Sequence, residues 1–223
     1  MTARRMSDIL HARGIRGICV APAPGASGPL QFPWNDFACV AIGYSLTEPV
    51  MHRTGPHQYN NTRLALRHAR ELGYAKIGVY IESVTNGKDD DNWLAAVLAH
   101  RHHHPEDVMD VVMVQEFVKE EFLEWFSRFR PEVVITQKDE VPEWLRSAGM
   151  KVPDHTGVVA LNWTEELGEC TGIDLNVASI GASAVDMLIG QLHRNAWGAP
   201  EHPQIVLVEG TWKHGETVRG QQS

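Results

Sequence analysis

The chain has 223 residues, of which 43% are hydrophobic, and a formal net charge of −8. A soluble chain of this length can bury roughly 70% of its unfolded surface, and no apolar run approaches the about 18 residues of a membrane-spanning helix. The negative charge argues against a nucleic-acid-binding surface, which needs clustered Lys and Arg, so any DNA contact must come from elsewhere. Because no secretion signal opens the chain, we expect a cytoplasmic protein.

Short apolar segments alternate with longer helical patterns along the whole chain. In chain order, the sequence predicts strands over residues 17–22, 37–43, 76–82, 108–114, 133–136, 157–161 and 204–210. It predicts helices over residues 61–72, 92–104, 120–129, 142–149 and 179–198. This alternation is typical of a doubly wound α/β fold, in which parallel sheets are flanked by helices.

The polar, turn-rich segment SVTNGKDDD suggests a boundary between a first part, residues 1–85, and a second part, residues 86–223. If each part contains a small parallel sheet, the carboxyl ends of the strands would face a shared cleft, where open α/β sheets bind ligands. Polar residues directly follow two of the predicted strands, at Lys138-Asp139 and at Asn162-Trp163. These two places are therefore candidate walls of a ligand pocket.

The order of the motifs resembles the effector-binding domain of the lactose/galactose repressor (LacI) family of bacterial transcription regulators. The similarity extends from about Ile9 to Arg219 and rests on four segments together, NTRLALRHARELGYAKIGVY, PEVVITQKDEVPEWLRSAGMKVPDHTGVVALNW, TGIDLNVASIGASAVDMLI and VLVEGTWKHGETVR. The resemblance implies a two-lobed fold of the periplasmic-binding-protein-like type I. It also implies a small sugar-like effector between the lobes, and DNA binding by a homodimer through separate N-terminal heads.

The start of the chain departs from that family. Family members carry a helix-turn-helix head, a hinge helix and two further strands before the segment with which this chain begins, and none of them precedes residue 1. We therefore expect an N-terminally truncated effector domain with an incomplete first lobe, in which the strand GICVAP has an unpaired edge. Such a chain would contact DNA only through the missing head.

The resemblance also assigns residues to the ligand site. Asp139 holds the position of an Asp that hydrogen-bonds sugar hydroxyls in the family, whereas Lys138 replaces an Asn and Asn162 replaces an Asp. The sugar-binding Arg of the family has no counterpart, because an Asp-Asp-Asp run followed by Trp93 occupies its region. The predicted ligand-binding residues are Asp139, Lys138, Asn162, Trp163, Asn176, Trp93 and Asp91.

Structural roles compete with these assignments. Asp139 suits a cap of the helix that begins at Pro142, and a Trp next to apolar residues often fills a core. The histidines of residues 100–104 suit a solvated helix end better than a zinc site, because no spaced His or Cys completes a tetrahedral set. Asp139 and its neighbours therefore remain candidates with two possible roles.

No catalytic or phosphate-binding motif occurs in the sequence, so we expect neither an enzyme nor a bound metal or cofactor. Two alternatives to a regulator stay open. The first is a stand-alone sugar-binding protein of the periplasmic type. The second is a metal-dependent hydrolase that would use the Asp89-Asp90-Asp91 run.

Overall fold

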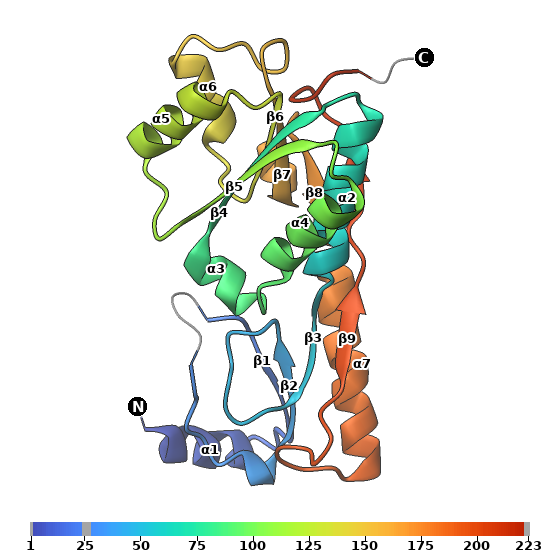
Figure 1. Cartoon of the computed structure of the whole chain (residues 1–223). Coiled ribbons are helices and arrows are strands. Elements are labelled where there is room, and N and C mark those ends of the chain that lie inside the picture. The colour runs from blue at the N-terminus through green and yellow to red at the C-terminus, as the bar shows by residue number, and fades with distance from the viewer. Residues whose placement is uncertain (1, 24–27, 221–223) are drawn as a thin grey trace. The chain divides into compact units, whose positions relative to one another are not determined.

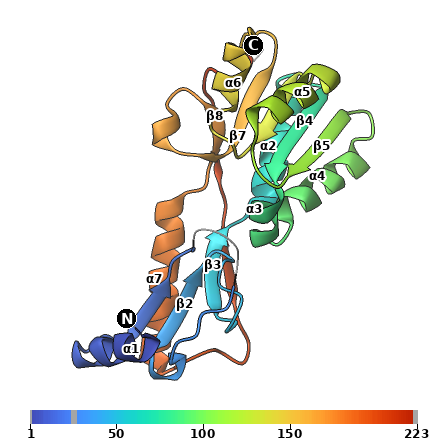
Figure 2. The ribbon, with the colours of Figure 1, turned by 90° about the vertical axis from the view of Figure 1, so that its left-hand side faces the viewer.

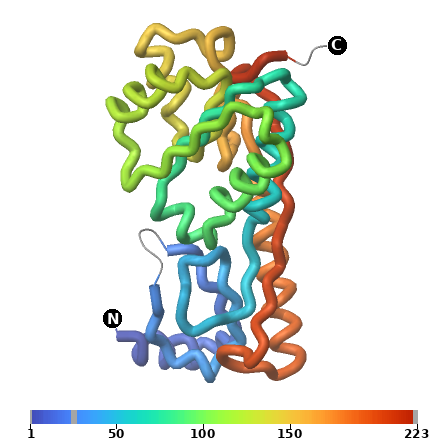
Figure 3. The backbone as a smooth tube through the Cα atoms, viewed as in Figure 1, coloured from blue at the N-terminus to red at the C-terminus, as the bar shows by residue number. Residues whose placement is uncertain are grey.

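The computed structural model describes residues 2–23 and 28–220, which form two compact units. Unit 1 combines Met1–Pro56 with Asn176–Val208, and unit 2 combines His57–Leu175 with Glu209–Ser223. The chain therefore passes between the units three times, as its path in Figure 3 shows. None of the described helices is long and apolar enough to cross a lipid bilayer.

Unit 1 contains a four-stranded parallel sheet in the order β1-β2-β3-β9. Its strands are β1 (Gly17–Val20), β2 (Ala38–Ile42), β3 (His52–Pro56) and β9 (Ile205–Val208). Its helices are α1 (Ala3–Ala12), the short 3-10 helix η1 (Trp34–Asp36) and α7 (Val177–Arg194). Helix α7 packs along β2 and β3, which Figure 2 shows from the side. Strand β1 pairs with β2 only, so the expected unpaired edge is present among the described residues.

Unit 2 contains a six-stranded sheet in the order β10-β8-β7-β6-β4-β5, which is parallel except for the antiparallel pair β10-β8. Its strands are β4 (Lys76–Glu82), β5 (Val108–Val114), β6 (Val133–Thr136), β7 (Gly157–Trp163), β8 (Thr171–Asp174) and β10 (Thr211–Lys213). Its helices are α2 (Gln58–Glu71), α3 (Ser83–Lys88), α4 (Asn92–His103), α5 (Lys119–Phe129), α6 (Val141–Ser147) and the 3-10 helix η2 (Glu165–Leu167).

Helices cover both faces of the sheet in unit 2, with α2 and α4 on one face and α5 and α6 on the other (Figure 1). The alternation of side chains along β4 explains this arrangement. Ile77, Val79 and Ile81 join the core under α2 and α4, whereas Tyr80 packs against Phe122 under α5. Strands buried on both faces are the reason why the predicted apolar runs are continuous.

The structure corrects the predicted boundary between residues 85 and 86. That position lies inside unit 2, because β4 pairs with β5 on one side and with β6 on the other. The segment 83–91, predicted as a loop, contains helix α3. The chain instead leaves unit 1 after Pro56 and returns to it over Asn176–Val208.

Three short strands were not predicted, namely β3, β8 and β10. Strand β3 has the sequence HRTGP, in which Arg, Gly and Pro disfavour a buried strand. Its Arg53 is nevertheless buried, because the guanidinium donates hydrogen bonds to the carbonyls of Gly43 and Leu46. Pairing with both β2 and β9 therefore outweighs the low strand propensity of the segment.

Candidate functional site

Three neighbouring strands of unit 2 end at the same edge of the sheet. The parallel register aligns Tyr80 of β4 with Thr136 of β6, and Thr136 with Ala160 of β7. The residues that follow these three aligned positions along the chain therefore lie at the carboxyl edge of the sheet, and they include Gln137 and Asn162. In open parallel sheets this carboxyl edge is the place where ligands bind.

Several buried polar atoms near this edge have no hydrogen-bond partner among the described residues. They are both amide atoms of Gln137, Asn162 Oδ1, Trp93 Nε1 and Gln58 Oε1. Buried polar groups are almost always hydrogen-bonded, so each of these atoms needs a partner from outside the protein. A hydroxyl-rich ligand or ordered water would supply one.

Asp89 adds a carboxylate to the same unit. Gln58 Nε2 donates a hydrogen bond to Asp89 Oδ2 over 3.1 Å. Burial raises the pKa of Asp89 to about 6, although the Gln58 hydrogen bond and the charge of Lys88 act in the opposite direction. A carboxyl group with this pKa changes its charge close to neutral pH, which is characteristic of functional sites.

Sequence reasoning noted Asp89 as one of three consecutive Asp residues, but it selected Asp91 for the ligand site. In the structure Asp91 is exposed and accepts a hydrogen bond of 2.6 Å from Asn86 Nδ2. Asn86 also binds the backbone of helix α4, since its Oδ1 accepts from the Leu94 N–H over 3.2 Å. Asp91 is thereby held in the turn between α3 and α4. Gln58 was not predicted, because nothing in its sequence context distinguishes it, whereas Gln137 directly follows the predicted strand 133–136 and could have been found by the signal that indicated Lys138.

Trp93 was predicted at the ligand site, and its side chain is fully buried in the core under α2 and α4. The indole ring therefore has the structural role that sequence reasoning kept as an alternative. Its Nε1, however, has no partner among the described residues. The ring can pack in the core while its N–H remains available as a donor.

Lys138 and Asp139 follow β6, as predicted. Lys138 forms an ion pair of 2.8 Å with Glu140 and lies over the rings of Phe117 and Trp144. Asp139 is exposed and lines a cavity of about 280 Å³ together with Arg146 of α6. Asp139 thus lies on the α6 side of the sheet, whereas Trp93 lies on the α2 and α4 side.

The immediate neighbours of Asp139 affect the pKa of its carboxyl group. Although Asp139 is largely exposed, partial desolvation of its carboxyl group raises the pKa, the neighbouring Glu140 raises it further, and Lys138 opposes both effects. Cys170 and Thr217 line the cavity as well, and Thr217 Oγ1 lies 3.7 Å from the Cys170 sulfur. These residues belong to the end of the sheet where β8 begins.

Asn162 and Trp163 end strand β7. Trp163 Nε1 donates to the carbonyl of Cys170 over 2.8 Å, and Lys213 lies 5.4 Å from the centre of the indole ring. Trp163 therefore contributes to local packing at the β7-β8 pair. Asn162 differs, because its Oδ1 is buried without a partner among the described residues.

Asn176 lies in unit 1, whereas the other predicted ligand-binding residues lie in unit 2. It precedes helix α7 in a left-handed conformation with φ 54°, and its carbonyl accepts hydrogen bonds from the N–H groups of Ser179 and Ile180. Asn is one of the few residues that adopt this conformation readily. Asn176 therefore has a structural function at the start of α7.

Over residues 2–23 and 28–220, no group of three or more His, Cys, Asp or Glu side chains is arranged to hold a metal ion. This finding includes the Asp89-Asp90-Asp91 run. Asp90 and Asp91 both have a φ of 56°, and Asp89 faces Gln58. The run is thus part of a tight turn between two helices.

A sequence profile for a family described as the periplasmic binding protein-like domain matches residues 66–218, which is more than half of the chain. No curated protein sequence shows significant similarity to the chain. Many solved structures share the fold of this chain, and three of them are described below.

The first is a periplasmic binding protein/LacI transcriptional regulator from Alkaliphilus metalliredigens QYMF in complex with D-xylulofuranose, with a TM-score of 0.72, 15% identity, and coverage of 97% of this chain and 82% of that one. The second is a LacI family transcriptional regulator from Enterococcus faecium with bound ribose, with a TM-score of 0.65, 12% identity and coverage of 98% and 85%. The third is the complex of the transcriptional regulator CelR with cellobiose, with a TM-score of 0.66, 15% identity and coverage of 96% and 69%. At these identities the likeness shows a shared fold.

Proposed function

The chain belongs to the family of periplasmic binding protein-like domains, and on this basis we propose that it is the sugar-sensing effector domain of a LacI-type transcription regulator. Three proteins of the same fold contain a bound sugar, and their names describe transcription regulators. In this proposal the protein is a cytoplasmic homodimer that contacts DNA through a head outside the 223 residues. Since one fold can host many functions, the proposal depends on the site.

The observation that carries the proposal is the set of buried polar atoms without partners at the strand ends of unit 2. The amides of Gln137 and Asn162 can both donate and accept, the carboxylate of Asp89 accepts, and Trp93 Nε1 donates. A sugar presents hydroxyl groups that both donate and accept. The available donors and acceptors therefore match a polyol better than an apolar ligand.

Ligand sensing requires that the ligand prefer one conformation of the protein. A ligand shifts a conformational equilibrium only by the difference between its affinities for the two states. In a complete regulator, that difference would be coupled to the affinity for the operator, and linkage requires that ligand and DNA change each other's affinity by the same factor. Helix α2 is suited to such coupling, because Asn61 binds the N–H of Gly210, where the chain re-enters unit 2.

The proposal is tested by calorimetric titration of the chain with D-ribose, D-xylulose and cellobiose. We expect at least one of these sugars to bind, and Gln137→Ala to weaken its binding about tenfold, which corresponds to ~1.4 kcal/mol. Gln31→Ala is the matched control, because Gln31 is an exposed glutamine of unit 1. Absence of binding for all sugars, or equal effects of both substitutions, would count against a sugar site at the strand ends.

A further inference from the structure

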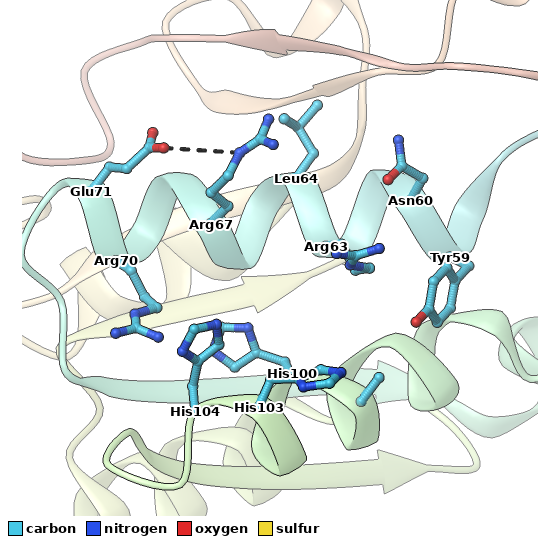
Figure 4. A pocket seen from close by; sticks show the side chains of 11 residues that line it. Tyr59, Asn60, Arg63, Leu64, Arg67, Arg70, Glu71, His100, His103 and His104 are labelled. Carbon is cyan, nitrogen blue, oxygen red and sulfur yellow. Dashed lines mark ion pairs between the residues drawn. The ribbon is translucent and has the colours of Figure 1, made fainter.

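A second concave surface of unit 2 lies between helices α2 and α4, which cover one face of the sheet (Figure 4). Its volume is about 490 Å³, within the range of small-molecule sites. Six basic side chains line it, namely Arg63, Arg67, Arg70, His100, His103 and His104. Such a concentration is unusual in a chain with a net charge of −8. We call this surface the basic groove.

The basic side chains come from regular positions on the two helices. Arg63 and Arg70 are seven residues apart on α2 and therefore lie on one face of that helix, whereas His100 and His103 lie in the last turn of α4 and His104 directly follows it. Figure 4 shows Arg63 and Arg70 directed toward the histidines of α4, whereas Arg67 and Glu71 point away and form the rim.

Part of the groove is neutralised by carboxylates. Arg70 forms an ion pair of 2.8 Å with Glu106 and lies 3.5 Å from Asp107. Asp107 also lies 2.7 Å from Nε2 of the buried His100. These contacts hold Arg70 and His100 in place and compensate the charge of Arg70.

Arg63 and His103 are the uncompensated members of the groove. Both are exposed, and neither forms an ion pair with a carboxylate within the described ranges. The guanidinium of Arg63 lies 5.7 Å from the centre of the Tyr59 ring, which restricts its position. The planar guanidinium matches two oxygens of a phosphate at once, and the imidazole provides a further donor.

We propose that the basic groove binds a small organic phosphate monoester, with Arg63 and His103 contacting the phosphate. Tyr59, Leu64 and Ala99 supply apolar lining for the organic part of the ligand. The volume of the groove also exceeds the need of a free phosphate ion. This site is distinct from the strand-end site, so the two proposals stand or fall separately.

The test is calorimetric titration of the complete chain with ribose 5-phosphate, inorganic phosphate and ribose. We expect ribose 5-phosphate to bind with a dissociation constant below about 1 mM, more tightly than inorganic phosphate, and less tightly as the salt concentration rises. The variant Arg63→Gln/His103→Gln is expected to weaken this binding at least about tenfold. Because both side chains are exposed, the variant should keep the unfolding temperature of the wild type.

The matched control is Arg101→Gln/His102→Gln, which removes the same residue types from exposed positions of α4 outside the groove. We expect it to leave the binding of ribose 5-phosphate unchanged. Arg63→Lys keeps the charge and loses the planar fork, so it should give an intermediate affinity. Equal effects of the two double variants, no binding of ribose 5-phosphate, or equal affinity for inorganic phosphate would overturn the proposal. Binding of ribose alone that is insensitive to Arg63 would report on the strand-end site.

Discussion

Gln58 and Asp89 connect the start of helix α2 to the end of helix α3, through a hydrogen bond of 3.1 Å from the amide to the carboxylate. The two residues are 31 positions apart, and the intervening chain forms the rest of α2, then β4 and α3. The carboxylate is largely removed from water, which raises its pKa to about 6. Within the described part of the chain, this contact places a carboxyl group whose pKa is raised toward neutrality next to an amide whose Oε1 has no hydrogen-bond partner.

The raised pKa of Asp89 predicts a specific dependence of stability on pH. Because the folded-state pKa of about 6 exceeds the ordinary value of 3.8, the folded state binds the proton more tightly than the unfolded state does. The resulting stabilisation is complete below the unfolded pKa and is lost as the pH rises through about 6. Asp89→Asn should therefore be more stable than the wild type at about pH 7.5, by up to ~2 kcal/mol.

Urea denaturation at about pH 4.5 and about pH 7.5 measures this difference in the free energy of unfolding. The advantage of Asp89→Asn should shrink at the lower pH, where the wild-type carboxyl group is protonated. Asp90→Asn is the control, since Asp90 is an exposed neighbour. If Asp89→Asn were more stable than the wild type by the same amount at both pH values, the raised pKa of Asp89 would be contradicted.

Asn162 and Asp139 are two of the positions that the resemblance places at the sugar site, and the structure gives them different surroundings. Asn162 Oδ1 is buried without a partner among the described residues, whereas Asp139 is exposed in the cavity beside Arg146. For a sugar that binds the chain, we expect Asn162→Ala to reduce the affinity about tenfold or more, or ~1.4 kcal/mol. Asp139→Ala should have a smaller effect in the same calorimetric titration. A larger loss of affinity for Asp139→Ala would indicate that the sugar binds in the cavity beside α6.

Gly172 of β8 tests the close packing of β7 against β8. A Cβ atom at this position would lie 2.5 Å from the carbonyl oxygen of Ala160 and 2.9 Å from Cβ of Trp163. Gly172→Ala should therefore lower the free energy of unfolding by ~1–3 kcal/mol. Gly181→Ala in helix α7 is the contrast, because its Cβ would meet no atom within 4 Å, and Ala is favoured over Gly in a helix by about 0.5–1 kcal/mol. Similar effects of the two substitutions in denaturant unfolding would show that the packing of β7 against β8 is less close than these distances indicate.

The pair of His100 and Asp107 tests the packing of α4 against the start of β5. The side chains are 7% and 6% exposed, and burial lowers the pKa of His100 although the hydrogen bond with Asp107 opposes the shift. Asp107→Ala leaves the imidazole N–H buried without an acceptor, so we expect a loss of about 2 kcal/mol in the free energy of unfolding. Glu106→Ala removes a carboxylate from the exposed neighbouring position and should cost clearly less. Equal losses in chemical denaturation would mean that His100 finds another acceptor.

Much of the fold could be predicted from the sequence. The strands around Val79, Val111, Ile135 and Val159 are short apolar runs separated by helices, and the structure confirms each of them in a parallel sheet. Such strands can be recognised in the sequence, because a strand covered by helices on both faces must be apolar throughout. The boundary of the units could not be predicted in the same way, since it depends on which strands pair.

Some residues of the candidate site could likewise be predicted from the sequence, and others could not. Position after a strand singled out Lys138, Asp139 and Asn162, because the topology of a parallel sheet makes strand ends recognisable in sequence. Gln58 and Asp89 come from two helix ends that only the folded chain brings together. Gln58 is not distinctive in its local sequence, and the Asp-Asp-Asp run indicated Asp89 only as part of an alternative metal site.

The amino-acid sequence by itself determined the alternation of strands and helices, since hydrophobic periodicity reports locally on which side chains must be buried. Only the tertiary structure decided that His52–Pro56 forms a strand, because the hydrogen bonds of Arg53 and the pairing with β2 and β9 involve partners distant in sequence. It likewise decided which polar atoms remain without partners and how the arginines of α2 meet the histidines of α4. Such relationships arise from packing between segments far apart in the chain.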